Sequence, residues 1–461
     1  MNGVSSLMPI LAFVLVIYLI LKRPIFRIPF TQKFIKIDYG LAPIIGVALL
    51  AITFSIGGSS IVNGISGTET IKPYAILILF MSLAYICVSL DSTGFFAYLS
   101  LLAMKAAKGN GRRLFLYFFM LSSFLTLFTS NDIVILTLTP IIYYFSKNAK
   151  VDPVPFLIAE FFAANIWSAA LYIGNPTNII VAQAYNISFI EYSKWMVLPT
   201  IAAGATCLAL LLLIFRRRIP KKFHVPTAPP ESAFKSKGGA IFGSITLACC
   251  LFTLSMSPLI NVPIWAITLF FAGVMLVHDL LRYHILVAHK PEKEAVSYMP
   301  RIPAISSRIP WKIVPFVLGL FIMVESLSVY GWTDKLASSI SAVSTNIFLA
   351  VFIMGFLSAF ASNITNNQPM TILFTRTLQN NLFIAPATAM KGATFALILG
   401  SNFGANLTMI GALAGIMWGK ILFDKGCSIS FKEFSKYGFL IMPLVIAAAC
   451  LVLVVELMLW A

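Results

Sequence analysis

The sequence has few charged residues, and acidic residues are the scarcest of them. Of its 461 residues, 16 are Asp or Glu and 33 are Lys or Arg, so that 11% of the chain is charged while 59% is hydrophobic. Soluble domains carry about 25% charged residues, so this composition excludes an ordinary water-facing fold. The net charge of +17 does not indicate a nucleic-acid-binding domain, because the basic residues lie between apolar segments.

Motifs for nucleotide, metal and redox chemistry are also lacking. The sequence contains no GxxxxGK[ST] phosphate loop, no HExxH pair and no CxxC spacing among its six cysteines, which we interpret as small packing residues. We therefore expect no cofactor, no metal and no enzymatic activity. The chain itself is therefore not expected to hydrolyse ATP.

Apolar stretches of membrane-spanning length recur along the whole chain. A bilayer core of about 30 Å requires roughly 20 apolar residues in a helix. We predict ten crossings, at roughly 7–21, 40–56, 71–90, 154–190, 195–215, 239–257, 262–280, 313–329, 386–422 and 437–460. The first is interpreted as a retained helix rather than a signal peptide, because no Lys or Arg precedes it. The chain is thus predicted to be an all-α polytopic membrane protein.

Two of these segments are too long for one helix and carry helix-breaking residues midway. GNPTN (174–178) interrupts the segment 154–190, and GSNFGAN (400–406) interrupts the segment 386–422. Such clusters at membrane depth are typical of discontinuous helices that line a solute cavity. We therefore predict two broken helices.

Two further pairs of apolar segments are joined by turns of a few polar residues. The pair 112–147 turns at SND (130–132), and the pair 346–379 turns at SNITNNQP (362–369). The second arm of each pair is about a dozen to sixteen residues, which is short for a full crossing. We predict re-entrant hairpins that enter the membrane and return to the same side.

The positions of Lys and Arg predict the orientation of the chain. With the elements above, 28 of the 33 basic residues fall on one side, in the loops 22–36, 105–113, 147–150, 216–237, 282–312 and 420–436. The positive-inside rule places these loops in the cytoplasm and both termini outside. We expect a multi-pass protein of the plasma (cell inner) membrane.

The order of elements in residues 1–215 recurs with opposite orientation in residues 239–461. Each half has three crossings, a hairpin, a broken helix and a final crossing, so we predict an inverted repeat. The basic, proline-rich segment 216–238 is interpreted as a cytoplasmic linker, with contact to anionic lipid headgroups as the alternative. The amphipathic segments 92–106 and 331–343 are expected to be connecting arms along the membrane surface.

Polar residues at the four interruptions are the candidate solute-binding residues. Backbone groups freed at a break in hydrocarbon cost several kcal/mol each unless they are paired, and Asn amides pair with such groups or with a solute. Half-helix N-termini would add partial positive charge. The candidates are Asn131, Asn175, Thr177, Asn178, Asn363, Asn366, Asn367, Asn402 and Asn406. The alternative is that the amides only pair with neighbouring backbone.

Three carboxylates within apolar segments are candidates for ion or proton coupling. A carboxylate at bilayer depth costs at least a few kcal/mol, so it faces a cavity, finds a partner or takes up a proton. Asp132, at the turn of the first hairpin, is the leading candidate, followed by Glu160 and Glu325. The alternative for Glu160 and Glu325 is an inter-helix hydrogen bond to a Ser or Asn.

Four stretches of the sequence resemble a known family. They are DSTGFFAYLSLLAMKAAKGNGRRLFLYF (91–118), SNDIVILTLTP (130–140), SNITNNQP (362–369) and GSNFGANLTMIGALAGIMW (400–418). They resemble the bacterial arsenite/antimonite efflux permease ArsB, a family of the wider ion transporter superfamily, over most of the chain. The resemblance implies an elevator-type carrier with Asp132 and the nine candidate solute-binding residues above lining its cavity, and an ArsA-type ATPase as a candidate partner. YIGNPTNIIVAQ (172–183) is instead similar to antiporter-like and silicon-efflux-like relatives.

The leading hypothesis from the sequence is secondary active efflux of arsenite or antimonite, coupled to protons or to the membrane potential. No Arg or Lys lies at the hairpin turns, which counts against a dicarboxylate site. A sodium/proton antiporter, with Asp132 as cation ligand, and another anion transporter of the superfamily are the alternatives. A membrane scaffold or a membrane-embedded enzyme is the alternative of another class, and it would move no solute in proteoliposomes.

Overall fold

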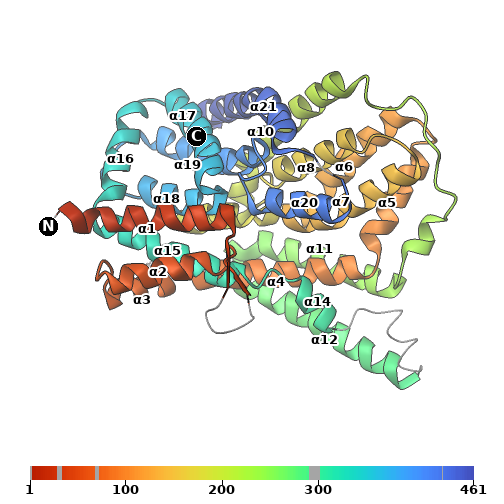
Figure 1. Ribbon diagram of the computed structural model, residues 1–461, viewed down its shortest axis with the longest axis horizontal. Helices are drawn as coiled ribbons and strands as arrows, with labels where there is room; N and C mark the ends of the chain where they lie inside the picture. The colour runs from red at the N-terminus through yellow and green to blue at the C-terminus, as the bar shows by residue number, and fades with distance from the viewer. Residues whose placement is uncertain (1–2, 28–33, 68–71, 290–301, 428, 461) are drawn as a thin grey trace.

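The computed structural model describes residues 3–27, 34–67, 72–289, 302–427 and 429–460 (Figure 1). The predicted loops 22–36 and 282–312 lie partly outside the described residues. Two short strands, β1 (Ile25–Arg27) and β2 (Phe34–Lys36), pair antiparallel, and helices form the rest of the regular structure in the described part of the chain.

The first half of the chain contains α1 (Gly3–Lys22), α2 (Ala42–Ile52), α3 (Gly58–Ser66), α4 (Pro73–Ser92), α5 (Phe95–Ala106), α6 (Gly111–Phe128), α7 (Asn131–Asn148), α8 (Val154–Trp167), η1 (Tyr172–Gly174), α9 (Pro176–Ala184) and α10 (Phe189–Phe215). The 3-10 turn η2 (Pro230–Ala233) lies in the linker. The second half contains α11 (Lys237–Ile260), α12 (Ile264–His289), α14 (Ile302–Arg308), α15 (Ile313–Val329), α16 (Trp332–Val343), α17 (Ile347–Thr365), α18 (Asn367–Leu378), α19 (Ala387–Phe403), η3 (Gly404–Asn406), α20 (Leu413–Asp424) and α21 (Phe431–Trp460).

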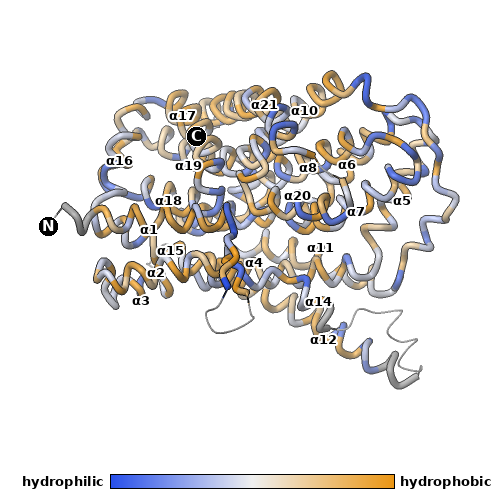
Figure 2. Tube along the Cα trace, in the orientation of Figure 1, coloured by the Kyte–Doolittle hydropathy of each residue, from blue (hydrophilic) through white to orange (hydrophobic). Residues whose placement is uncertain are grey.

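Long apolar helices make the chain a polytopic helical membrane protein. In the described residues, eight segments are long and apolar enough to cross a bilayer. Hydrophobic residues cover the outer helices as well as the interior (Figure 2), and large apolar side chains such as Leu213, Phe252 and Leu444 are more than half exposed. Lipid, rather than water, is the solvent that suits such a surface.

The prediction of a single crossing over residues 40–56 is wrong. Helix α2 ends at Ile52, and its 11 residues span about 17 Å, which is too short for a bilayer core of about 30 Å. The hydroxyl of Thr53 donates to the backbone oxygen of Leu49 at 2.8 Å, and Phe54 has a φ of +52°. The glycine pair Gly57 and Gly58 then begins α3. Both short helices pack against α15.

The helices pack in two groups, and each group takes elements from both halves of the sequence (Figure 1). The first helix group contains α1 to α4, α11, α12 and α15. The second helix group contains the paired segments α6 and α7, α8 and α9, α17 and α18, and α19 and α20, together with α10 and α21. Contacts of α15 with α18, and of α4 with α7 and α9, join the two groups.

The two predicted arms are helices, α5 and α16, and each follows a glycine in the left-handed region. Gly94 has a φ of +86° and Gly331 a φ of +74°, a conformation that favours glycine. The linker 216–238 packs against the first arm. The amide of Lys235 donates to the oxygen of Thr93 at 2.9 Å, and the rings of Tyr98 and Phe234 stack with centroids 4.4 Å apart.

Helices α17 and α19 pack closely because Gly400 has no side chain. A Cβ on Gly400 would lie 1.9 Å from Oγ of Ser358 and 2.4 Å from the backbone oxygen of Gly355. Both distances are far inside van der Waals contact, so a larger residue would force the helices apart. This contact matters for the site because Ser401 and Asn402 follow directly.

We predict that Gly400→Ala lowers the stability of the folded protein by about 1–3 kcal/mol, the usual range for overpacking a filled interior. A lower apparent melting temperature in detergent would show this. Gly58→Ala is the matched control, because nothing lies within 4 Å of a Cβ built there. Equal melting temperatures for the two variants would contradict the close packing of α17 on α19.

Candidate functional site

The four predicted interruptions are present and lie largely buried. Helix α6 ends at Phe128 and α7 begins at Asn131, while α8 ends at Trp167 and α9 begins at Pro176. Only Asn366, with a φ of +74°, separates α17 from α18. Helix α19 ends at Phe403, and α20 begins at Leu413. Helix α7 has 18 residues, longer than the dozen to sixteen expected for the second arm of a hairpin.

Asn402 joins the interruption in α19 and α20 to the one between α8 and α9. Its Oδ1 accepts hydrogen bonds from Oγ of Ser168 at 2.7 Å and from Nδ2 of Asn175 at 2.9 Å. Its Nδ2 donates to Oδ1 of Asn178 at 2.8 Å. Next to it, Oγ of Ser401 donates to Oγ1 of Thr177 at 3.2 Å. The side chain of Asn402 is fully buried, so these bonds replace water that cannot reach it.

Asn165, in the last turn of α8, connects three of the interruptions. Nδ2 of Asn406 donates to the backbone oxygen of Phe162 at 3.3 Å, and Oδ1 of Asn406 accepts from Nδ2 of Asn165 at 2.9 Å. Oδ1 of Asn165 in turn accepts from Nδ2 of Asn131 at 2.9 Å. The tip of α7 is thereby tied to both broken helices.

The turn between α17 and α18 is bound to the α19 to α20 interruption. Nδ2 of Asn363 donates to the oxygen of Gly404 at 2.8 Å, and its Oδ1 accepts from Thr408 at 2.6 Å. Nδ2 of Asn366 donates to the oxygen of Ile410 at 3.3 Å. Nδ2 of Asn367 donates to the oxygen of Ser401 at 3.4 Å. The structure thus brings all nine candidate residues together with Asn165, and we call this set the amide cluster.

Four amide oxygens at the two hairpin turns have no hydrogen-bond partner among the described residues. They are buried, and they belong to Asn131, Asn366, Asn367 and Gln368. For Asn366 and Asn367 the amide nitrogen faces a carbonyl oxygen, so the side-chain oxygen must point away from it. For Asn131 the chain of bonds from Phe162 through Asn406 and Asn165 fixes the same orientation. The cluster therefore offers acceptor oxygens to a donor or a cation.

Asp132 lies beside the cluster, at the boundary between the two helix groups. It lines a small pocket of about 40 Å³ that is bounded by Phe80 and Val88 of α4 and by Arg308 of α14. Arg308 forms an ion pair with Asp91 at the end of α4. A pocket of this size is large enough to hold water beside the carboxylate.

Tyr39 lies just before α2, and its ring packs edge-on against Phe316 with centroids 5.7 Å apart. Burial, with the negative charges of Asp132 and Asp38, raises the pKa of Tyr39 to about 12. Its hydroxyl therefore keeps its proton at neutral pH and can donate a hydrogen bond.

The other two candidate carboxylates have partners of their own. Oγ1 of Thr139 donates to both carboxylate oxygens of the fully buried Glu160, at 3.1 and 3.2 Å, and so ties α7 to α8. This is the inter-helix bond considered as the alternative for Glu160, with Thr in place of Ser or Asn. Glu325 of α15 forms an ion pair with Arg376 of α18, across the boundary between the helix groups.

The sequence analysis missed one residue of the amide cluster, Asn165, and four residues beside it, namely Ser168, Ser401, Thr408 and Gln368. Ser401 and Gln368 lie within motifs that were recognised, but they were not singled out. Asn165 lies in the run FFAANIW (161–167), where an isolated amide in an apolar helix was the available signal.

Comparison with known proteins identifies the relatives of the chain. The family described as citrate transporter (CitMHS) matches residues 16–390. Arsenical pump membrane proteins of Yersinia enterocolitica and Escherichia coli are each 29% identical over 367 residues, which cover 78% of this chain and 81% of theirs. An uncharacterized transporter of Mycobacterium tuberculosis is 26% identical over 389 residues, 82% of this chain and 85% of its own.

A solved structure has a similar fold. The YdaH transporter of Alcanivorax borkumensis aligns with a TM-score of 0.56 and 13% sequence identity, over 98% of this chain and 97% of the transporter. At this identity the likeness concerns the fold alone, and it supports the polytopic helical architecture described above.

We predict that Asn402→Ala destabilises the protein by at least about 2 kcal/mol, because it leaves buried partners on Ser168, Asn175 and Asn178 without their bond. Thermal unfolding in detergent measures the loss. Asn148→Ala, at the exposed end of α7, is the control and should change the melting temperature little. A melting temperature for Asn402→Ala as high as that of the control would show that the bonds do not hold the broken helices together.

Proposed function

This chain belongs to the citrate transporter family, and we propose that it is a secondary active transporter that exports arsenite or antimonite. Relatives named arsenical pump membrane proteins, 29% identical over most of their length, support the metalloid substrate. We propose that the amide cluster holds the solute and that Asp132 couples its movement to protons. A contribution of the membrane potential, and an ArsA-type ATPase as partner, belong to the same proposal by resemblance to arsenical pumps.

The unpaired acceptor oxygens of the cluster are the observation that carries this choice of substrate. Neutral arsenite, As(OH)₃, presents three O–H donors, which match the free oxygens of Asn131, Asn366 and Asn367. The ionised carboxylates of a citrate or dicarboxylate anion only accept hydrogen bonds, so they require Arg, Lys or N–H donors, and citrate has a single hydroxyl donor besides them. Arg376, the cation on α18, is already paired with Glu325. The chemistry of the cluster therefore favours a neutral hydroxide over the carboxylates that the family name suggests.

A sodium/proton antiporter is the second candidate, and the same oxygens favour it. Amide and backbone oxygens at helix breaks coordinate Na⁺ in transporters, and a nearby carboxylate adds the negative charge that a cation needs. Asp132 would then be part of the cation site. Direct transport measurements distinguish the two candidate functions, because arsenite is neutral and sodium is a cation.

The arrangement of the helices supports alternating access by relative motion of the two groups. We propose that α6 with α7 and α17 with α18 are re-entrant hairpins of an inverted repeat, entering from opposite sides. The second helix group carries the amide cluster. The arms α5 and α16 each begin after a left-handed glycine, and each connects a helix of the first group to a helix of the second, α4 to α6 and α15 to α17. Movement of this group against the first would carry the solute as in an elevator, with the basic loops in the cytoplasm.

We predict that everted membrane vesicles accumulate arsenite and antimonite in preference to silicate, sodium and succinate. Asn131→Leu should reduce arsenite uptake about tenfold or more, because it replaces a buried acceptor with an apolar group of similar size. Asn148→Leu, at the exposed end of the same helix, is the matched control. Uptake of succinate in place of arsenite, or wild-type arsenite uptake by Asn131→Leu, would contradict the proposed site.

We predict that Asp132→Asn removes the dependence of uptake on an imposed proton gradient, because an amide cannot take up and release a proton. The initial rate of arsenite uptake is compared with and without the gradient, at matched protein levels. Glu231→Gln, in the exposed part of the linker, is the control and should keep the dependence. An unchanged gradient dependence in Asp132→Asn would remove the coupling role from this residue.

A further inference from the structure

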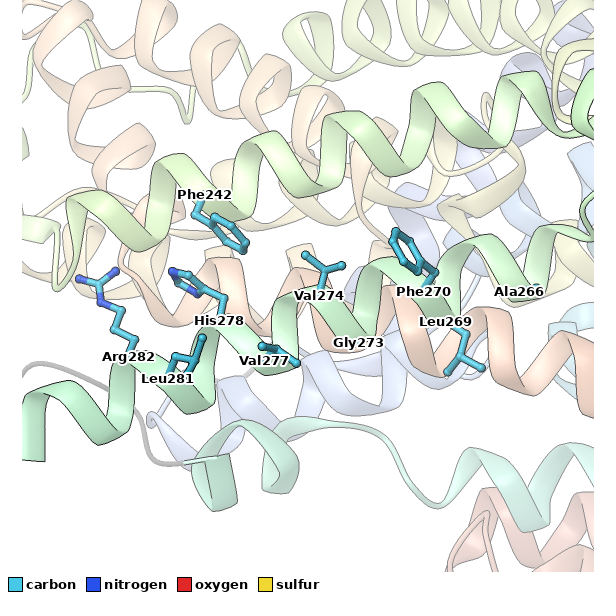
Figure 3. Close-up of a pocket in the computed structure, with 10 residues that line it drawn as sticks. All are labelled: Phe242, Ala266, Leu269, Phe270, Gly273, Val274, Val277, His278, Leu281 and Arg282. Atoms are coloured by element: carbon cyan, nitrogen blue, oxygen red, sulfur yellow. The ribbon is translucent and has the colours of Figure 1, made fainter.

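A large apolar groove lies on the outer face of α12, in the first helix group and separate from the amide cluster. Its volume is about 920 Å³, and Figure 3 shows the residues that line it. Nine of its ten lining residues belong to α12 and recur every three or four positions, namely Ala266, Leu269, Phe270, Gly273, Val274, Val277, His278, Leu281 and Arg282. This spacing places them in one stripe along the helix. The tenth, Phe242, belongs to α11.

The middle of the stripe is hollow because Gly273 has no side chain. Nothing lies within 4 Å of a Cβ built on Gly273. The large side chains on either side of it are strongly exposed, Phe270 at 65% and Leu281 at 59%. A groove of this shape, open to the side and lined by apolar groups, accommodates a hydrocarbon chain lying along the helix.

One end of the groove is polar and cationic, and the other end is apolar. Figure 3 shows Arg282 and His278 at one end of the row and Ala266 at the other. The His278 ring stacks on Phe242 with centroids 3.9 Å apart and an angle of 9° between planes. Arg282 reaches the first turn of α11, where its Nη1 would lie 2.6 Å from a Cβ on Gly239. The exposed Lys237 lies at the same helix start.

The acidic residue next to this end, Asp279, is buried between α4 and the groove, and its Oδ1 lies 3.2 Å from Nδ1 of His278. Asp279 is 6% exposed and accepts hydrogen bonds from Ser89 at 2.6 Å and from Tyr85 at 3.0 Å, both on α4. Among the described residues, Arg282 forms no ion pair. Of the described charged groups named at this end, Arg282 and Lys237 are cationic and Asp279 is the one carboxylate, so their sum is positive.

We propose that this groove binds one anionic membrane phospholipid, with its phosphate at Arg282 and an acyl chain along α12 toward Ala266. The distance from His278 to Ala266 along the helix is about 18 Å, close to the roughly 15 Å of one leaflet of the hydrocarbon core. A cationic group at the headgroup level and an apolar channel one leaflet long match the two parts of such a lipid. The site is independent of the transported solute.

A second copy of this chain is the other occupant to consider, and the charge argues against it. Two copies related by a two-fold axis along the membrane normal would bring equivalent cationic ends to the same level of the membrane. Arg282 and Lys237 of one copy would then meet like charge, whereas a phosphate neutralises them. The hollow at Gly273 of one copy would also face the same hollow of the other copy and remain unfilled.

The test is lipid binding to the purified, delipidated protein, measured by native mass spectrometry with phosphatidylglycerol and with phosphatidylcholine. The wild type should retain one tightly bound phosphatidylglycerol and prefer it over phosphatidylcholine about fivefold. Arg282→Gln should lose this preference. Gly273→Phe, which fills the hollow, should lose the tightly bound lipid of either kind. Arg113→Gln, at the start of α6, is the control for loss of one positive charge and should behave as the wild type.

Two results would overturn the proposal. One is a phosphatidylglycerol preference in Arg282→Gln equal to that of the wild type. This result would contradict the proposal even if Gly273→Phe failed to fold. The other is a wild-type dimer without bound lipid that Gly273→Phe converts to a monomer. The second result would assign the face to contact between copies of the chain.

Discussion

The structure depends on one constraint, that main-chain groups freed by a helix break inside the membrane must find partners without water. Asn178, Asn363 and Asn366 meet this constraint by donating to backbone oxygens at the breaks. Asn402 and Asn165 then link the interrupted helices to one another through buried side-chain hydrogen bonds. The nine candidate residues and Asn165 therefore form one connected cluster, in which the polar groups of the four interruptions bond to one another. Close approach of α17 and α19, permitted by Gly400, brings the last of the interruptions into contact with the others.

Within the cluster, two kinds of amide have different consequences. Asn402 has both polar atoms occupied by protein partners, so it holds the broken helices together. Asn131, Asn366 and Asn367 have their nitrogens occupied and their oxygens free. The same residue type thus stabilises the fold at one position and keeps an unpaired acceptor oxygen at another, and the second kind is the one that we propose to contact the solute.

The positions of the interruptions followed from the sequence because clusters of Gly, Pro and Asn inside apolar segments disfavour a continuous helix. The exact pairing did not follow, because which amide meets which carbonyl depends on helix rotation. Asn165 was missed for a different reason, because a single amide in the apolar run FFAANIW does not indicate a helix break. The error at 40–56 arose because hydropathy does not register the turn at Thr53 and Phe54. The packing of the linker on α5 rests on contacts such as Tyr98 with Phe234, which composition alone does not predict.

The central claim is that the free amide oxygens at the two hairpin turns hold the transported solute. A structure determined with antimonite tests it directly, because antimony gives an anomalous X-ray signal that locates the metalloid without reference to the protein. The account predicts antimony within hydrogen-bonding reach of the side-chain oxygen of Asn131, Asn366 or Asn367. Antimony bound at the cysteines, with none at the amide cluster, would contradict it.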